Sequence, residues 1–208
     1  MQAPRLPFSE LPPANLVFLI DVSGSMSSPN KLPLVINSLR LLTAELRAQD
    51  RVAIAVYAGA AGLVLPPTLG SDKARIFEAL DRLQSGGSTN GAAGIRLAFQ
   101  TAREHFLTEG ANRVILATDG DFNVGTTSDS ELIQLIETER KSGVFLTVLG
   151  FGMGNTQHAK MEQLADKGNG NYFYIDNGKE GQRVLVDRLS ATLLTIAKDV
   201  KIQIEFNP

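Results

Sequence analysis

Five oxygen-bearing side chains, in three separate segments of the chain, have the chemistry of a site for a hard divalent cation. Asp21, Ser23 and Ser25 stand at alternate positions of one short segment, and Thr89 and Asp119 follow in two later segments. The set contains carboxylates and hydroxyls but neither an imidazole nor a thiolate. Such a set suits Mg²⁺, Mn²⁺ or Ca²⁺ and suits zinc or copper poorly. The sequence therefore predicts a hard divalent cation, Mg²⁺, Mn²⁺ or Ca²⁺, held by these five residues.

The charge of this set decides what a bound cation can do. Asp21 and Asp119 together neutralise a divalent ion, and the three hydroxyls add no charge. If the carboxylates act through water, the metal remains electrophilic and keeps one coordination position open. The expected ligand at that position is an anion from outside the chain.

Alternating strand and helix patterns must position these residues. The predicted strands span 16–20, 52–57, 62–65, 114–117, 145–149 and 172–175, and the predicted helices span 31–47, 72–83, 92–106, 130–141, 158–167 and 181–197. Continuous apolar strands alternating with amphipathic helices indicate an α/β fold, doubly wound, with a mostly parallel central sheet and helices on both faces.

The site residues follow predicted strands or lie in a loop between elements. Asp21 comes directly after the first strand, and Asp119 comes after the strand over 114–117. Gly24 lets the first segment curl, so that its alternate side chains can turn toward one point. Ligands of such sheets bind at the carboxyl ends of the strands. The five residues should therefore converge at one edge of the sheet.

These residues resemble the metal-ion-dependent adhesion site of von Willebrand factor type A domains. That signature is Asp-x-Ser-x-Ser, then a separate Thr and a separate Asp, and the similarity runs from about residue 14 to residue 197. The resemblance implies a Rossmann-like fold in which Ser23 and Ser25 bind the metal directly, Thr89 binds it in an open state, and the aspartates often act through water. It also implies a protein partner that supplies a Glu or Asp carboxylate.

Two further features refine the resemblance. The run Thr118-Asp119-Gly120-Asp121 and the proline-rich first residues look most similar to a bacterial group, the YfbK-type proteins. Similarity to bacterial envelope-associated proteins favours an extracytoplasmic location in the periplasm or cell envelope. No inserted helix is evident between Gly91 and Asn112, so a shape change of the kind found in some integrin-type domains is not expected.

Composition excludes several other functions. The net charge is −2, from 20 basic and 22 acidic residues without a block of like charge, which argues against nucleic-acid binding. The absence of cysteine excludes a disulfide framework, a thiolate zinc site and a cysteine nucleophile. The apolar stretch over 53–65 contains glycines and is too short to cross a bilayer. The 208 residues suit one domain, and 43% are hydrophobic, enough for a sizeable core.

An enzyme is the main rival to a binding module. A Mg²⁺-dependent hydrolase or phosphotransferase could use Asp21 as its nucleophile. However, Ser23 stands where such phosphotransferases need a second aspartate, and Lys31 is the one lysine near the cluster in sequence. The sequence favours a cation-dependent adhesion or scaffold module without enzymatic activity; a purely structural cation site is the third possibility.

For several residues near the candidate site, a local structural role is an alternative to a role in metal binding. Asp121 is either a turn residue or an outer contact of the site, and Met26 and Phe122 either flank the metal or pack locally. His105 and His158 fit helix surfaces or helix ends. The run over 150–154 resembles a dinucleotide loop but lacks its third glycine at the required spacing.

The patterns at the two ends of the chain predict segments outside the central domain. Residues 1–13, with four prolines, form an extended lead-in segment to a domain over 14–198. Residues 199–208 alternate apolar and polar side chains, which is typical of a half-buried strand leading into a following domain. We expect the chain to be a fragment of a longer protein.

Overall fold

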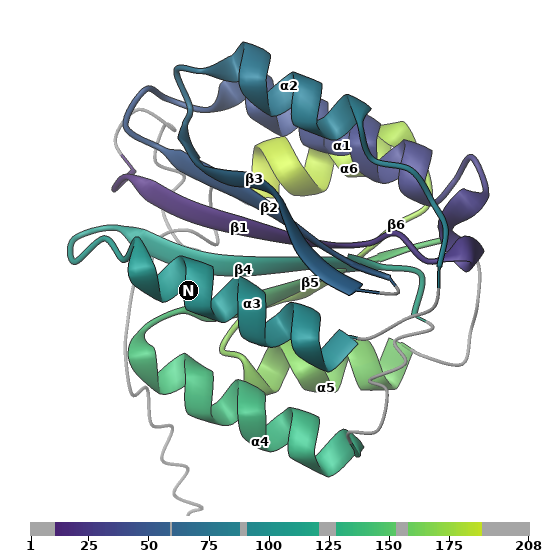
Figure 1. Cartoon of the computed structure of the whole chain (residues 1–208), viewed down its shortest axis with the longest axis vertical. Coiled ribbons are helices and arrows are strands. Elements are labelled where there is room, and N and C mark those ends of the chain that lie inside the picture. Colours follow the sequence, from purple (N-terminus) through teal and green to yellow (C-terminus); the bar gives the residue numbers. More distant parts are fainter. Residues whose placement is uncertain (1–10, 59, 88–90, 121–127, 153–157, 189–208) are drawn as a thin grey trace, which may run out of the picture.

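The computed structural model of the chain describes residues 11–58, 60–87, 91–120, 128–152 and 158–188. Its centre is a six-stranded sheet in the order β3-β2-β1-β4-β5-β6 (Figure 1). The strands are β1 (Ala14–Asp21), β2 (Arg51–Ala58), β3 (Ala60–Leu69), β4 (Ala111–Thr118), β5 (Phe145–Phe151) and β6 (Tyr172–Ile175). All neighbouring strands are parallel except β3, which runs antiparallel to β2 at the edge.

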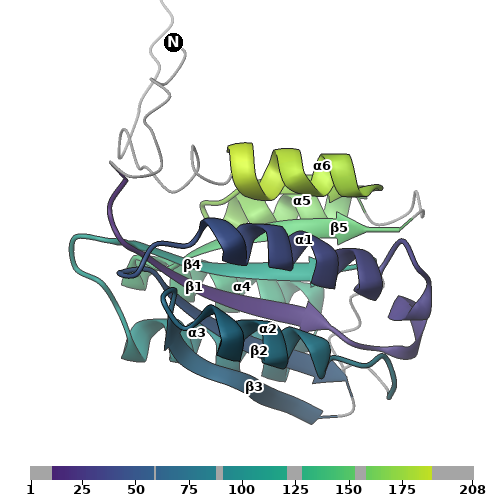
Figure 2. The ribbon, with the colours of Figure 1, turned by 90° about the horizontal axis from the view of Figure 1, so that it is seen from above.

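Helices cover both faces of the sheet. They are α1 (Leu32–Glu45), α2 (Lys73–Asp81), α3 (Gly91–Glu104), α4 (Asp129–Glu139), α5 (His158–Lys167) and α6 (Gly178–Gln182), which continues as a π-helix over Arg183–Arg188. Figures 1 and 2 show α1, α2 and α6 on one face, with α3, α4 and α5 on the other. The molecule therefore has three layers, as the doubly wound prediction requires.

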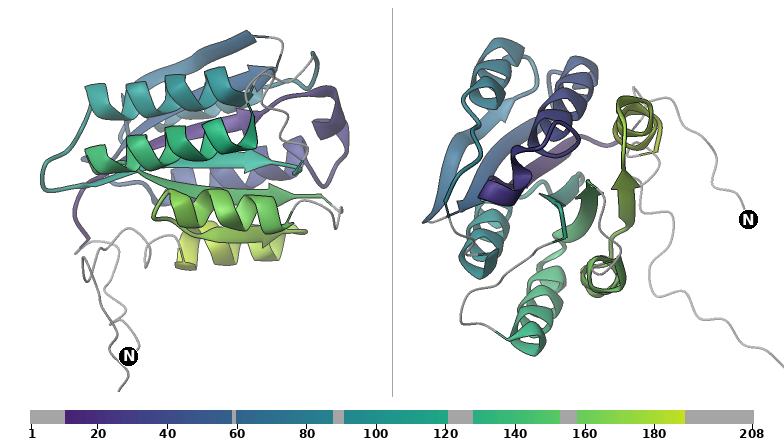
Figure 3. Two further views of the ribbon diagram at one scale, coloured as in Figure 1. Left: turned by 90° about the horizontal axis from the view of Figure 1, so that it is seen from below. Right: turned by 90° about the vertical axis from the view of Figure 1, so that its right-hand side faces the viewer.

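The alternation of side chains along β1 explains why both layers form. All eight residues of β1 are buried. Phe18 and Ile20 join the core beneath α1, while Val17 and Leu19 join the core beneath α3. A strand that is apolar on both faces is stable only between two covering layers. Figure 3 shows these layers from two further sides.

The topology creates a switch point between β1 and β4. From β1 the chain winds outward through β2 to β3, and then returns to β4 and winds the other way through β5 to β6. Ile20 pairs with Ala117 in the parallel register, so Asp21 and Thr118 end neighbouring strands at the same edge. Crevices of this kind are where open α/β sheets bind ligands.

The predicted doubly wound fold is confirmed, and most predicted elements differ from the observed ones by only a few residues. The largest difference is β3, which was predicted over 62–65 but spans Ala60–Leu69 and includes Pro66 and Pro67. Its edge position tolerates proline, because one side of the strand needs no hydrogen-bonded partner. The connection from β2 is too short for a parallel crossover, which explains its antiparallel direction.

Two predictions concern segments outside the described residues. The strand over 199–208 and the last part of the helix predicted to end at 197 both lie there. Among the helices of the described ranges, none combines the length and apolar character that a bilayer crossing requires.

Candidate metal centre

A tight turn after β1 brings the first three predicted ligand residues together. The amide of Ser23 donates to Asp21 Oδ1 at 2.9 Å, and the amide of Met26 donates to the Ser23 carbonyl at 3.0 Å. This curl leads into a 3₁₀ turn over Gly24–Ser27. The hydroxyls of Ser23 and Ser25 consequently lie 3.0 Å apart. Two neutral hydroxyls therefore converge beside a carboxylate.

Asp21 lies at the bottom of this turn and is held from the neighbouring strands. Its Oδ2 accepts hydrogen bonds from the Tyr57 hydroxyl at 3.0 Å and from Thr118 Oγ1 at 3.1 Å. Thr118 Oγ1 in turn accepts from the Gly120 amide at 3.2 Å. The Asp21 side chain is fully buried, so β2 and β4 fix its orientation.

The surroundings of Asp21 destabilise its ionised form, so a nearby positive charge would stabilise the carboxylate. Burial raises the pKa of Asp21 above 3.8, and the negative charge of Asp119 adds to the rise, although hydrogen bonds from Ser23 and Tyr57 oppose it. Burial, with the nearby Asp21 charge second, also raises the pKa of the Tyr57 hydroxyl well above 10.0, so that it stays a donor. A buried carboxylate of this kind is stabilised by a nearby cation.

Asp119 follows β4 and is engaged by a lysine. Lys31 Nζ lies 2.9 Å from Asp119 Oδ2, and the same ammonium donates to the Ser25 carbonyl at 3.1 Å. The Asp119 side chain is 3% exposed, while that of Lys31 is 21% exposed. A positive charge of the chain itself thus stands between the β1 turn and the end of β4.

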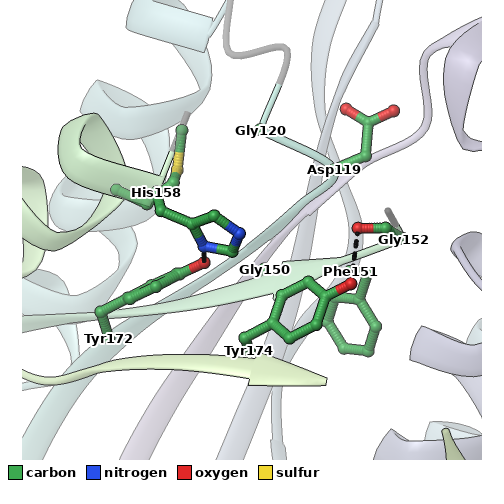
Figure 4. A pocket seen from close by; sticks show the side chains of 9 residues that line it. Asp119, Gly120, Gly150, Phe151, Gly152, His158, Tyr172 and Tyr174 are labelled. Carbon is green, nitrogen blue, oxygen red and sulfur yellow. Dashed lines mark hydrogen bonds between the residues drawn. The ribbon is translucent and has the colours of Figure 1, made fainter. Parts of the chain in front are cut away.

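A small hollow opens beside Asp119. Asp119, Gly150 and Gly152 line it together with the rings of His158, Tyr172 and Tyr174. Figure 4 shows the rings grouped apart from Asp119, whose carboxylate turns away from them. The Tyr174 hydroxyl donates to the Gly152 carbonyl at 3.1 Å, and the His158 and Tyr174 rings meet edge to face with centroids 5.2 Å apart. The hollow therefore borders the site through the loop that ends β5.

The loop that carries Thr89 begins next to the β1 turn. The Gly86 amide donates to the Val22 carbonyl at 2.7 Å. Thr89 itself, with Asp121 and Phe122, lies outside the described residues. Its role as a ligand stays a prediction.

Comparison with known proteins identifies the family. The von Willebrand factor type A domain matches residues 15–187. The chain belongs to the von Willebrand factor type A domain family. YfbK of Escherichia coli strain K12 is 52% identical over 199 residues, which cover 96% of this chain and 35% of YfbK. Human inter-alpha-trypsin inhibitor heavy chain H4 is 30% identical over 88% of this chain and 19% of its own length. The A domain thus spans about a third or less of these two relatives.

Solved structures show the same fold. A von Willebrand factor type A protein from Catenulispora acidiphila superposes with a TM-score of 0.73 at 18% identity, over 88% of this chain and 43% of that one. BatB from Bacteroides thetaiotaomicron gives 0.69 at 21%, covering 86% and 98%. Manganese-loaded Plasmodium vivax TRAP protein gives 0.66 at 21%, covering 83% and 72%. At these identities the likeness establishes the fold of the A domain alone.

The described part of the A domain gathers four of the five predicted ligand residues at one edge of the sheet. Asp21, Ser23 and Ser25 lie in the β1 turn, and Asp119 reaches that turn through Lys31. Met26 is fully buried in the core beneath α1. The local-packing alternative therefore holds for Met26, because the curl that exposes Ser25 turns the next side chain inward.

Three residues of the site were not assigned a role by sequence. Tyr57 and Thr118 donate to Asp21, and Lys31 pairs with Asp119. The pairing register places Tyr57 directly beside Asp21, but that register is a property of the folded sheet. Thr118 offered a weak signal, as the residue before Asp119. His158 does begin a helix, as predicted, yet it also reaches the border of the site.

The donor set of the A domain fits a hard divalent cation. The described residues contain no group of three or more His, Cys, Asp or Glu side chains that could hold a metal. A site here would depend on neutral hydroxyls for part of its coordination, as Ser23 and Ser25 provide. The ammonium of Lys31 already demonstrates that Asp119 accepts a positive charge at this position. Because every donor in the set is an oxygen, its ligand chemistry suits Mg²⁺, Mn²⁺ or Ca²⁺ better than zinc.

Proposed function

We propose that this A domain is a divalent-cation-dependent protein-binding module for adhesion or scaffolding. Asp21, Ser23, Ser25, Thr89 and Asp119 would hold one cation, Mg²⁺ first, with Mn²⁺ or Ca²⁺ as alternatives. A protein partner would complete the coordination with a Glu or Asp carboxylate. The manganese carried by the structurally similar Plasmodium vivax TRAP protein supports a cation.

The observation that carries the proposal is the pairing of two neutral hydroxyls with a buried carboxylate at the switch point. The Ser23 and Ser25 hydroxyls lie 3.0 Å apart beside Asp21. Hydroxyl ligands neutralise none of the charge of a cation, so the bound ion retains a strong attraction for one external anion. The position at the carboxyl ends of the strands leaves that direction accessible to a partner.

The geometry disfavours the rival enzyme. A nucleophilic aspartate has to present one oxygen to a substrate. Asp21 is fully buried, Oδ1 accepts from the Ser23 amide, and Oδ2 accepts from Tyr57 and Thr118. We expect no metal-dependent turnover of phosphate or ester substrates; turnover abolished by Asp21→Asn would overturn the binding proposal.

Metal binding is best measured with Mn²⁺ by the relaxation rate of water protons. The wild-type domain should bind one Mn²⁺, whereas Ser23→Ala and Asp119→Ala should weaken binding by at least about 10–100-fold, as for other changes that disturb metal-site contacts. Ser142→Ala is a matched control, since that hydroxyl bonds the Glu139 carbonyl on another part of the surface. Equal Mn²⁺ binding by all four proteins would place the cation elsewhere.

The open coordination position can be tested with acetate as a minimal carboxylate. Acetate added to the Mn²⁺-loaded domain should lower the proton relaxation enhancement, because it replaces metal-bound water. An alkylammonium salt at the same concentration should have no effect. Mn²⁺ binding without an acetate response would favour the purely structural cation site. An extracytoplasmic location of the whole protein remains a further proposal.

A further inference from the structure

Lys31 is the charged side chain that links the two halves of the site. It precedes α1, and its ammonium donates both to the Ser25 carbonyl at 3.1 Å and to Asp119 Oδ2 at 2.9 Å. These two acceptors belong to segments on opposite sides of the switch point. One ammonium therefore bridges the two segments whose residues are expected to share a metal.

The stem of Lys31 packs against Gly152, which directly follows β5. Gly152 has φ +76°, and a Cβ there would lie 2.6 Å from Lys31 Cε and 2.8 Å from Lys31 Cγ. The Tyr174 hydroxyl donates to the Gly152 carbonyl at 3.1 Å, which holds Gly152 in place. Exposed ion pairs usually contribute little to the stability of a protein, because both side chains move freely in water. Packing against Gly152 and the near-complete burial of Asp119 make this pair different.

We infer that Lys31 is a specificity-determining residue of the site: its ammonium is the counter-ion of Asp119 in the metal-free domain and competes with a divalent cation for that carboxylate. The inference rests on the proposed cation site. It adds a residue outside the predicted ligand set, with a role that depends on its charge. Once a cation is bound, the positive charge of Lys31 also affects how strongly the site attracts an anionic partner.

The formal charges give the competition its direction. With Lys31 present, the two carboxylates and the ammonium carry one net negative charge, and a divalent cation brings the site to one net positive charge. Without the lysine charge, the loaded site would be neutral. Lys31 should therefore weaken the binding of the cation and strengthen the attraction of the loaded site for an anionic partner.

The opposite effects expected on cation binding and on anion binding distinguish a role of the Lys31 charge from a role of its packing. A residue that only supported the shape of the site would, on substitution, weaken the binding of both the cation and the anion. Removal of a competing charge should tighten the first and weaken the second. Lys31→Met removes the ammonium and keeps an unbranched stem of similar length against Gly152, whereas Lys31→Arg retains the charge.

The first measurement is Mn²⁺ affinity, with Mn²⁺ as the sole added ligand. We expect Lys31→Met to bind Mn²⁺ about tenfold more tightly than the wild type, since a neighbouring like charge at the edge of a protein costs at least this much. Lys31→Arg should stay close to the wild type. Circular dichroism verifies folding, and Lys31→Gln replaces the Met variant if that variant does not fold. Unchanged or weaker Mn²⁺ binding by the folded, uncharged variant overturns the inference.

The second measurement is acetate binding to the Mn²⁺-saturated proteins. Lys31→Met should bind acetate several-fold more weakly than the wild type, because its loaded site lacks the excess positive charge. Equal or stronger acetate binding by Lys31→Met contradicts the inference. If the wild type itself binds no Mn²⁺, the proposed cation site fails; if it binds Mn²⁺ and Lys31→Met behaves like it, the inference about Lys31 fails alone.

Discussion

At the scale of single residues, Asp21 is a carboxylate whose supporting contacts come from the turn after β1 and from two neighbouring strands. Ser23 follows its own strand, Tyr57 comes from β2, and Thr118 comes from β4. These hydrogen bonds favour the ionised form, but burial raises its pKa more than they lower it. The metal-free domain thus carries an unfavourable charge at the place where a cation is expected.

This imbalance predicts a pH dependence of stability. Because the folded-state pKa of Asp21 lies above 3.8, its protonation favours the folded state; that contribution is complete below the unfolded-state pKa and is lost as pH rises through the folded-state value. Relative to Asp21→Asn, the metal-free wild type should lose unfolding free energy in urea as the pH rises from about 4, the unfolded-state pKa of an aspartate, through the folded-state value. Saturating Mg²⁺ should reverse this trend. A difference that rises with pH without metal would contradict the prediction.

Thr118 offers a matched pair of variants. Thr118→Ala removes the hydroxyl that donates to Asp21 Oδ2 and accepts from the Gly120 amide, whereas Thr118→Ser retains it. Loss of a hydrogen bond that orients a metal ligand typically weakens metal binding about 10–100-fold. We expect Thr118→Ala to weaken Mg²⁺ binding by this amount in calorimetric titrations. Equal affinities of the Ala and Ser variants would show that the hydroxyl does not support the site.

At the scale of elements, the end of β5 positions a side chain from the start of α1. Gly150 and Gly152 leave room on both sides of this turn, for the Tyr172 hydroxyl and for the Lys31 stem respectively. Two of the glycines in the run that superficially resembled a dinucleotide loop, Gly150 and Gly152, therefore have a packing function. They allow the end of β5 and Gly152 to lie close to the site.

Gly152→Ala tests this function. The positive φ and the contact with Lys31 should together destabilise the domain by about 1–2 kcal/mol or more, the typical cost of a left-handed conformation for a residue with a Cβ. Gly178→Ala is the control, because a Cβ there meets nothing within 4 Å. In a Lys31→Ala background the loss for Gly152→Ala should shrink toward the backbone strain alone. Equal urea midpoints for the two glycine variants would refute the packing argument.

At the scale of the whole molecule, a buried ion-pair cluster and the candidate site lie at opposite ends of the sheet. Asp50, just before β2, accepts hydrogen bonds from the Ala14 amide at 3.0 Å and from the Arg47 side chain at 2.8 Å. Arg47 also donates to the carbonyls of Leu11 and Pro12. This buried cluster ties the residues before β1 to the loop between α1 and β2, at the end of β1 away from Asp21.

Asp50→Ala should therefore lower stability without changing the site. Loss of one partner of a buried ion pair typically costs about 3–5 kcal/mol of unfolding free energy. Mn²⁺ affinity of the folded variant should stay at the wild-type value. Asp81→Ala is the control, since the exposed Asp81–Arg40 pair should contribute at most about 1 kcal/mol. A large change in Mn²⁺ affinity for Asp50→Ala would show that the two ends of the sheet are coupled.

Cation binding should also stabilise the whole domain. A ligand that binds only the folded state adds about 2.7 kcal/mol at a concentration of 100 times its Kd. Mg²⁺ should raise the thermal midpoint of the wild type, and EDTA should remove the effect. Asp119→Ala should show little response, because the variant lacks one of the two carboxylates. A wild-type midpoint that Mg²⁺ leaves unchanged would argue against the site.

The sequence by itself determined the layered α/β fold and the residue types of the candidate site. Hydrophobic periodicity is a local property, and the long apolar strands required covering helices on both faces. Asp21, Ser23 and Ser25 are close in the chain, so their curl could be inferred from spacing. Asp119 could be placed at the same edge because parallel strands align their carboxyl ends.

Tertiary structure alone decided which residues support those ligands. Tyr57 is 36 residues from Asp21, Thr118 is 97 residues from it, and Lys31 is 88 residues from Asp119. Their contacts depend on strand order and register, which periodicity does not fix. The same holds for Met26, whose burial follows from the curl of the turn. The sequence motif identifies the candidate ligands, whereas the fold determines which charged groups and hydrogen-bond donors contact them.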